Sequence, residues 1–166
     1  MVKHLTNPLI DRPAPLGNLL SAAARALSAE LDAGLVAAGF DDVRAAHAPV
    51  FQVIDPEGTR LTVLAERAGM TKQAMGELIR HLTDRGYVAV GPDPADGRAR
   101  LVRLTDRGWS AVEAGVRVVE QFDRHLDEVV GSAEVDRLRG ILARIIAGEG
   151  STYAQRSEDS AVMRLE

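Results

Sequence analysis

The strongest constraint on the fold is a change of hydrophobic period in the middle of the chain. Within 62–68 and 71–84, apolar residues recur every three or four positions, as on one face of an amphipathic helix. Within 87–90 and 99–104, the residue types and their alternation favour strands. The intervening 91–97, GPDPADG, is the densest turn signal in the chain. These patterns predict two short helices separated by a turn, followed by a hairpin with a polar tip.

Longer amphipathic helices are expected on both sides of this segment. The first follows an extended arm, in which Pro8, Pro13 and Pro15 prevent a regular helix. Gly39 is placed to end that helix. Its apolar stripe comprises Leu16, Leu20, Ala23, Leu27, Leu31 and Leu35.

A second helix is expected to use Asp41 or Asp42 as its N-cap and to carry Val43 and Val50 on its apolar face. Pro49 lies inside this segment and removes one helical hydrogen bond. We therefore expect this helix to kink or restart there.

Two more helices are predicted after the hairpin. Thr105 can cap a long one that ends at Gly131, and Ser132 can cap another that ends near Gly148. Beyond 149 the sequence is polar and aperiodic, so we expect the tail to fray. The apolar residues that we expect to be buried are Trp109, Val112, Val116, Val119, Phe122, Leu126, Val130, Val135, Leu138, Ile141, Leu142, Ile145 and Ile146.

The composition agrees with a mainly helical, globular chain. Hydrophobic residues make up 46% and aromatic residues only 4%, so the core is expected to be aliphatic and an all-β sandwich is disfavoured. The chain has no cysteine, which excludes disulfides, thiolate metal sites and cysteine nucleophiles. No apolar run is long enough to span a membrane, and we expect a cytoplasmic protein.

The charge is unevenly distributed along the chain. The formal net charge is -4, yet residues 60–108 contain nine basic against six acidic side chains. A mildly basic middle segment in an acidic protein indicates one surface that meets an anion.

The two short helices have the form of a helix-turn-helix, which lays its second helix in the major groove of DNA. Gln can hydrogen-bond adenine edges, and Lys can bond guanine or phosphate. Taken alone, an ordinary solvated helix face is the better interpretation, because such faces are common. The positions off the apolar stripe of that helix are Thr71, Lys72, Gln73, Ala74, Glu77, Arg80 and His81.

The hairpin makes DNA binding the better interpretation. Arg98, Arg100 and Arg103 lie at its tip and on its return strand, so it can project a guanidinium into an adjacent minor groove. The alternative is a surface loop whose arginines pair with Asp93 and Asp96. A helix-turn-helix followed by a hairpin is a winged helix.

Three ordered motifs resemble the DNA-binding lobe of the MarR (multiple antibiotic resistance regulator) family. They are RLTVLAERAGMTKQAM at 60–75, LTDRGYV at 82–88 and DPADGRARLVRLTDRG at 93–108. The resemblance in detail covers 44–108, and the flanking helices match in order and length. It implies a homodimeric winged-helix regulator of transcription, expected to be a repressor whose DNA affinity responds to a small aromatic or anionic ligand.

The resemblance also implies which residues touch DNA. The recognition-helix contacts fall at Thr71, Lys72, Gln73 and Ala74, with Glu77 and Arg80 as further candidates, and the wing contacts fall at Arg98 and Arg100. The family commonly has a second arginine where this chain has Gly97, which predicts a weaker phosphate contact and a more mobile tip.

We expect one MarR-like domain over 1–166, with a DNA-binding lobe at about 42–108, dimerisation helices at about 8–39 and 109–148, and a frayed tail at 149–166. A dimer would bind a pseudo-palindromic operator with half-sites about one helical turn, roughly 10 bp, apart. The alternative for the flanking stripes is that they pack only within one chain.

Other chemistry is disfavoured by the sequence. The four histidines lack metal-ligand spacing, and the chain has no Walker A motif, no dinucleotide-binding glycine pattern and no nucleophile elbow. We therefore expect no metal, no cofactor and no enzyme activity. His47 and Phe51 are candidates for a ligand pocket, because in a MarR-like fold their helix borders the cleft beside the DNA lobe. The alternative function is a winged-helix protein-interaction or dimerisation module.

Overall fold

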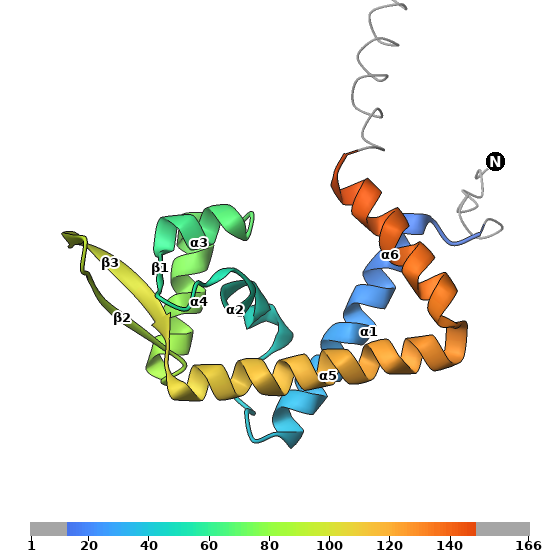
Figure 1. Cartoon of the computed structure of the whole chain (residues 1–166), viewed down its shortest axis with the longest axis horizontal. Helices are drawn as coiled ribbons and strands as arrows, with labels where there is room; N and C mark the ends of the chain where they lie inside the picture. The colour runs from blue at the N-terminus through green and yellow to red at the C-terminus, as the bar shows by residue number, and fades with distance from the viewer. Residues whose placement is uncertain (1–12, 149–166) are drawn as a thin grey trace, which may run out of the picture. The chain divides into compact units, whose positions relative to one another are not determined.

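The structure is a computed structural model that describes residues 13–148. These residues form two compact units, one ending at Glu120 and the other beginning at Gln121. The predicted class, mainly helical with a winged helix-turn-helix, is confirmed. The elements drawn in Figure 1 are α1 (Leu16–Ala37), the 3-10 helix η1 (Ala45–His47), α2 (Ala48–Val53), β1 (Thr59–Arg60), α3 (Leu61–Arg67), α4 (Lys72–Asp84), β2 (Val88–Asp93), β3 (Asp96–Leu104), α5 (Asp106–Val130) and α6 (Ser132–Ile146).

The helix-turn-helix forms where the sequence predicts it. Gly69 joins α3 to α4 with a φ of 62°, a left-handed conformation that glycine adopts without steric cost. The Thr71 hydroxyl accepts a hydrogen bond of 3.1 Å from the Ala74 N–H and so caps α4. The side chains that fill the core beneath the two helices are Leu64, Ala65, Met75, Ile79 and Leu82.

The wing is longer than predicted and has a third strand. The sheet is antiparallel with the order β1-β3-β2, and β2 and β3 run up to Asp93 and from Asp96, well inside the predicted turn. Pro92 can pair opposite Arg100 because β2 is an edge strand, where a missing N–H costs little. The two residues of β1 are too few to show an alternating pattern, so the sequence does not predict them.

The predicted second helix is wrong in its start. The chain forms η1 and then restarts as α2 at Ala48, with Pro49 in the first turn, where its missing N–H breaks no helical hydrogen bond. The predicted restart is thus confirmed. Asp42 is not an N-cap, because its carboxylate accepts hydrogen bonds from Tyr87 and Arg107 instead.

The root of the wing and the start of α5 are held by a close backbone approach. Thr105 caps α5 as predicted, since its hydroxyl accepts a 3.1 Å hydrogen bond from the Gly108 N–H. A Cβ atom on Gly108 would lie 2.2 Å from the Tyr87 carbonyl oxygen, a distance that no side chain tolerates. A similar contact joins α1 to α5, where a Cβ on Gly34 would lie 2.3 Å from Val118 Cγ2.

Much of the predicted apolar stripe on α5 is exposed. Trp109, which we predict to be a core residue, is 40% exposed, and Val116 is 50% exposed. The side chains that α5 buries in the first unit are instead the small Ala111 and Ala114. Periodicity identifies an apolar face but does not reveal what covers it. No helix among residues 13–148 combines the length and the apolarity needed to cross a membrane.

The second unit contains the end of α5 and α6. Arg139 bridges Asp123, at 2.8 Å, and Asp136, at 3.2 Å. Gly131, not the predicted Ser132, occupies the N-cap position of α6. Only Val135 of the predicted buried face of α6 is buried, and the exposed members are Leu138, Ile141, Ile145 and Ile146. Most of the predicted proline arm and the predicted frayed tail lie outside the described residues.

Candidate nucleic-acid interface

The start of α4 presents polar side chains to solvent. Lys72, Gln73 and Arg80 are exposed, while Ala74 is half-buried against the turn before it. Gln73 Nε2 lies 3.4 Å from Glu77 Oε1, which makes a long hydrogen bond that a base edge can replace. The residues that line a shallow hollow on this face are Leu61, Lys72, Gln73, Gly76, Glu77 and Arg80.

The cationic side chains of this face are free within the part of the chain that the structure describes. Over residues 13–148, the side chains of Lys72, Arg80, Arg98 and Arg100 form no ion pair or hydrogen bond. The Arg98 backbone N–H donates to Asp96 Oδ1 at 3.1 Å, which shapes the turn and leaves the guanidinium in solvent. These groups can therefore meet phosphate without first breaking an ion pair.

The wing aspartates do not pair with the wing arginines, so that alternative is wrong. Both Nε and Nη2 of Arg60 donate to Asp93 Oδ2, at 2.9 and 2.6 Å, and Nη2 also lies 3.6 Å from Asp96 Oδ2. Asp93 is only 7% exposed, and its other oxygen accepts the Ala95 N–H. These hydrogen bonds hold the pKa of Asp93 below its usual range. The sequence counts Arg60 only as a basic residue and misses this role.

Arg103 belongs to the base of the wing. Its Nε donates to the Glu57 carbonyl at 3.0 Å. Its Cγ packs so closely on Gly58 that a Cβ atom added to this glycine would lie only 2.6 Å from it. This arginine therefore joins β3 to the turn before β1.

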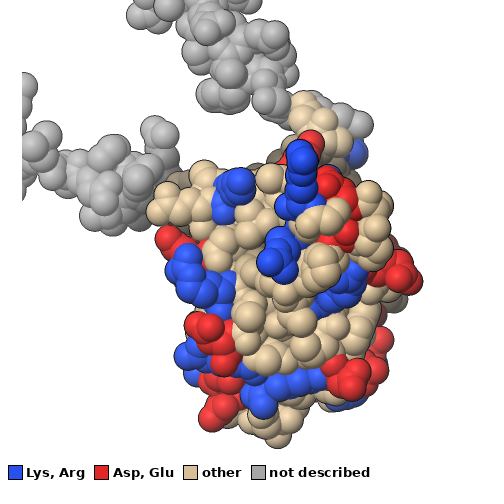
Figure 2. Space-filling model, turned by 90° about the vertical axis from the view of Figure 1, so that its left-hand side faces the viewer, with Lys and Arg blue, Asp and Glu red and all other residues tan. Residues whose placement is uncertain are grey.

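Figure 2 shows the end of the molecule that carries the wing and the helix-turn-helix. Lys and Arg side chains are interspersed there with Asp and Glu and do not form one continuous basic patch. Such a surface attracts DNA less strongly at long range than a uniformly basic one, so specific contacts have to supply more of the affinity.

An apolar cavity of about 330 Å³ lies in the first unit between α1, α2 and α5. Phe51 lines it, but His47 does not, because the His47 ring turns to the opposite side of η1 and stacks on His81. The remaining lining residues are Leu31, Leu35, Val43, Arg44, Ala48, Gln52, Ala111, Val112, Gly115, Val116, Val119 and Glu120.

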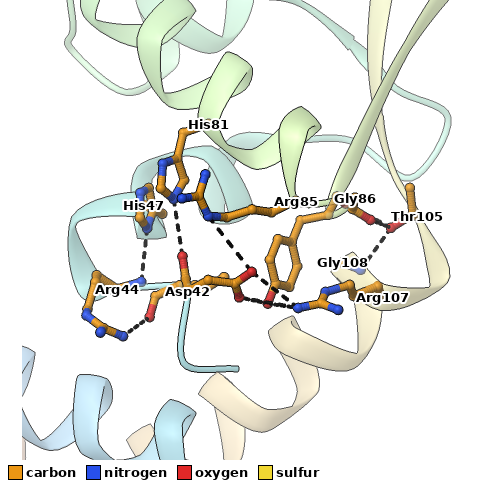
Figure 3. Close-up of polar contacts among 11 residues, drawn as sticks. Asp42, Arg44, His47, His81, Arg85, Gly86, Thr105, Arg107 and Gly108 are labelled. Atoms are coloured by element: carbon orange, nitrogen blue, oxygen red, sulfur yellow. Dashed lines mark hydrogen bonds and ion pairs between the residues drawn. The ribbon is translucent and has the colours of Figure 1, made fainter. Parts of the chain in front are cut away.

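A polar cluster that the sequence does not predict links the end of α4 to the start of α5 (Figure 3). The Tyr87 hydroxyl donates to Asp42 and accepts a 2.9 Å hydrogen bond from Arg107, whose guanidinium lies 4.6 Å from the Tyr87 ring centre. Burial alone would raise the pKa of Asp42, but the Tyr87 hydrogen bond and the Arg107 charge outweigh it and lower that pKa. Burial, with the hydrogen bond to Asp42, raises the pKa of Tyr87. The cluster joins these two elements through charged hydrogen bonds, and it contains no nucleophile exposed to a substrate.

Among residues 13–148, no three His, Asp or Glu side chains are grouped so that they could hold a metal ion.

Comparison with known sequences identifies one family. A MarR family model matches residues 41–99. HosA, a transcriptional regulator of Escherichia coli O111:H-, is 31% identical over 77 residues, which are 46% of this chain and 57% of HosA. HosA of Escherichia coli O127:H6 is 31% identical over 94 residues, which are 55% of this chain and 67% of HosA. The chain therefore spans between about half and two thirds of the length of these curated relatives.

Solved structures share the fold. The S. aureus MepR–DNA complex superposes with a TM-score of 0.69 at 16% identity, over 82% of this chain and 99% of MepR. CouR from Rhodococcus jostii RHA1 bound to p-coumaroyl-CoA gives 0.63 at 25% identity, over 84% of this chain and 95% of CouR. Motif order, helix-turn-helix, wing and relatives agree, and the chain belongs to the MarR family.

Proposed function

We propose that this chain is a sequence-specific double-stranded DNA-binding regulator of transcription and not an enzyme. The observation that carries this proposal is the pairing of a solvent-exposed helix start with an arginine wing whose cationic groups are unpaired within the described residues. A fold shared with the MepR–DNA complex supports it.

In this proposal α4 lies in the major groove. Thr71, Lys72, Gln73 and Ala74 face the bases or the nearest phosphates, with Glu77 and Arg80 at the groove edge. Gln73 is the base-reading residue, because an amide bonds both N6 and N7 of adenine. Arg98 enters the minor groove beside it, and Arg100 contacts the backbone.

The active form in our proposal is a homodimer, and it represses by occupying an operator. Exposed apolar side chains on α1 and α5 are the supporting observation, because a second copy of the chain can cover them. A two-fold dimer doubles the DNA contacts and fixes the separation of the half-sites. The exposed residues in question are Leu16, Leu19, Val36, Trp109, Val116 and Val119.

The apolar cavity suits a small effector. Its volume of about 330 Å³ is within the range of ligand sites, and its lining is aliphatic and aromatic except for Arg44, Gln52 and Glu120. Arg44 can bind an acidic group while Phe51 contacts a ring. We propose a small aromatic acid, which releases DNA only if it binds the DNA-free conformation more tightly.

Selection of bound duplexes from sheared genomic DNA tests the DNA-binding proposal. A recurrent, pseudo-palindromic sequence is expected, and log affinity for it should fall linearly with log salt. Lys72→Ala should flatten that salt dependence, while Arg25→Ala, an exposed arginine of α1, serves as the matched control. Enrichment of no duplex, with a stable dimer in sedimentation, would instead favour the protein-interaction module.

Operator release by a panel of aromatic acids and their neutral amides tests the effector proposal. Acids should act at lower concentrations than amides, and Arg44→Gln should remove that preference. Phe51→Ala should weaken both classes. Failure of the whole panel would identify a constitutive DNA binder.

A further inference from the structure

Two histidine rings stack against each other between the recognition helix and η1. The rings of His47 and His81 lie 4.4 Å apart between centroids with an interplanar angle of 16° (Figure 3). The sequence places His81 among the exposed positions of α4, but it is half-buried, and His47 is buried. Thirty-four positions separate the two residues in the chain, so no local pattern reports their contact.

Hydrogen bonds orient both rings and tie His47 to its neutral form. His81 Nε2 lies 3.2 Å from the Asp42 carbonyl oxygen, which can only accept, so this nitrogen carries the proton. His47 Nδ1 accepts the Arg44 N–H at 2.9 Å and must therefore be unprotonated. A proton on His47 Nδ1 would remove this acceptor and leave the Arg44 N–H facing an N–H.

The charged groups around His47 on balance oppose a positive charge on it. Burial lowers the pKa of His47, and the neighbouring His81 and Arg85 act in the same direction, against the opposite effects of the Arg44 backbone and of Asp32 on α1. His81 and Arg85 belong to α4 and its C-cap, while Arg44 precedes η1. Asp42 faces His81 through its backbone carbonyl, and its carboxylate is engaged by Tyr87 and Arg107.

The same short segment forms part of the cavity wall. Arg44 and Ala48, on either side of His47 in the chain, line the apolar cavity, and the Ala45 N–H donates to Asp32 of α1. η1 therefore has the cavity on one side and the recognition helix on the other. The histidine stack is a direct side-chain contact between η1 and the recognition helix.

We propose that His47 and His81 are positioning residues that hold α4 against the cavity wall, and that this contact requires the His47 ring to be uncharged. The inference rests on the proposed DNA binding and adds its regulation. Acidification separates the rings, moves α4 from its DNA-reading position and weakens operator binding. A protein without this contact behaves in the opposite way, because it becomes more positive as pH falls and binds the DNA polyanion more tightly.

The test is operator affinity measured from about pH 8 to about pH 5.5 at constant ionic strength, a range in which histidine titrates. Wild type should lose on the order of tenfold in affinity at the acidic end, because a proton on His47 is compatible only with the separated rings. In the double variant His47→Asn/His81→Gln, the amides can keep both hydrogen bonds but cannot take up a proton. This variant should show no acidic loss of affinity. His125→Gln, an exposed histidine on α5, is the matched control and should keep the wild-type profile.

Two outcomes would overturn the proposal: tighter binding by wild type throughout acidification, or the same acidic loss in the double variant. Failure of the proposed DNA binding is recognised separately, as absence of an operator complex at every pH. The histidine contact is then judged on the free protein by long-range nitrogen–proton NMR of the rings. His47 should keep an unprotonated Nδ1 when the pH falls just below 6.5, the ordinary pKa of histidine, and a protonated Nδ1 there would refute the contact.

Discussion

Arg60 donates two hydrogen bonds, at 2.9 and 2.6 Å, to a single carboxylate oxygen of Asp93 across 33 positions of sequence. Arg60 ends β1 at the entrance to α3, and Asp93 ends β2 at the turn of the wing. The contact therefore connects the helix-turn-helix to the tip of the hairpin. We therefore expect the direction in which Arg98 projects to depend on Arg60, which need not touch DNA itself.

Arg60→Ala should weaken operator binding by releasing the wing, and its effect should not add to that of Arg98→Ala. In a double-mutant cycle, the coupling between the two substitutions should exceed about 0.5 kcal/mol, the usual limit of additivity for independent sites. Additive losses would mean that Arg60 acts independently of the wing, by contacting a DNA phosphate itself. The control is Arg67→Ala, which breaks the ion pair between Arg67 at the end of α3 and Asp55 before β1. It should leave the effect of Arg98→Ala unchanged.

Arg60→Ala should also make the wing more mobile in the absence of DNA. Amide hydrogen exchange at 95–100 should become faster in Arg60→Ala, and Asp93→Asn should reproduce the change. Unchanged exchange in both variants would show that the turn holds its shape without the ion pair.

Gln73→Ala should relax base preference at one position in each half-site, by roughly 1–3 kcal/mol. Arg98→Ala should instead weaken binding to all sequences more evenly, most of all those with A·T-rich flanks, because their narrow minor groove attracts a guanidinium. Binding to a library of single-base operator variants measures both effects. A uniform loss from Gln73→Ala would place that side chain on the backbone.

Gly34→Ala should destabilise the fold by about 1–3 kcal/mol, the usual cost of overpacking, because the added Cβ would lie 2.3 Å from Val118 Cγ2. Denaturation in urea gives the free energy of unfolding, and adding Val118→Ala should recover part of the loss. Gly17→Ala is the matched control on the same helix, where nothing lies within 4 Å. It should be neutral or slightly stabilising, since alanine has the higher helix propensity.

The free energy of unfolding should fall as the pH drops below 6.5, the ordinary pKa of histidine. The folded state lowers the pKa of His47, so the unfolded chain takes up a proton first and stability is lost with acidification. The carboxyls of Asp42 and Asp93, whose pKa values are lowered, lose their contribution only below their ordinary value of 3.8. Urea denaturation of wild type and His47→Asn between pH 6.5 and pH 3.8 isolates the contribution of His47 to the free energy of unfolding. If this free energy changes equally with pH in the two proteins, His47 is not buried as a neutral ring.

The sequence predicts those parts of the fold that local signals determine. The turn between the two short helices and the cap at Thr105 each depend on residues within a few positions, and both are found as predicted. The Arg60–Asp93 and His47–His81 contacts escape prediction because they join residues more than thirty positions apart. Trp109 shows a further reason, since an apolar period is the same whether the face is covered by its own chain or by another.

The missing side chain at Gly108 has a mechanical consequence. The first turn of α5 contacts the backbone of Tyr87, one residue before β2, and no side-chain atom fits between them. The helix and the hairpin therefore meet through their backbones. A small rotation of α5 at this contact would displace the far end of the hairpin by a much larger distance.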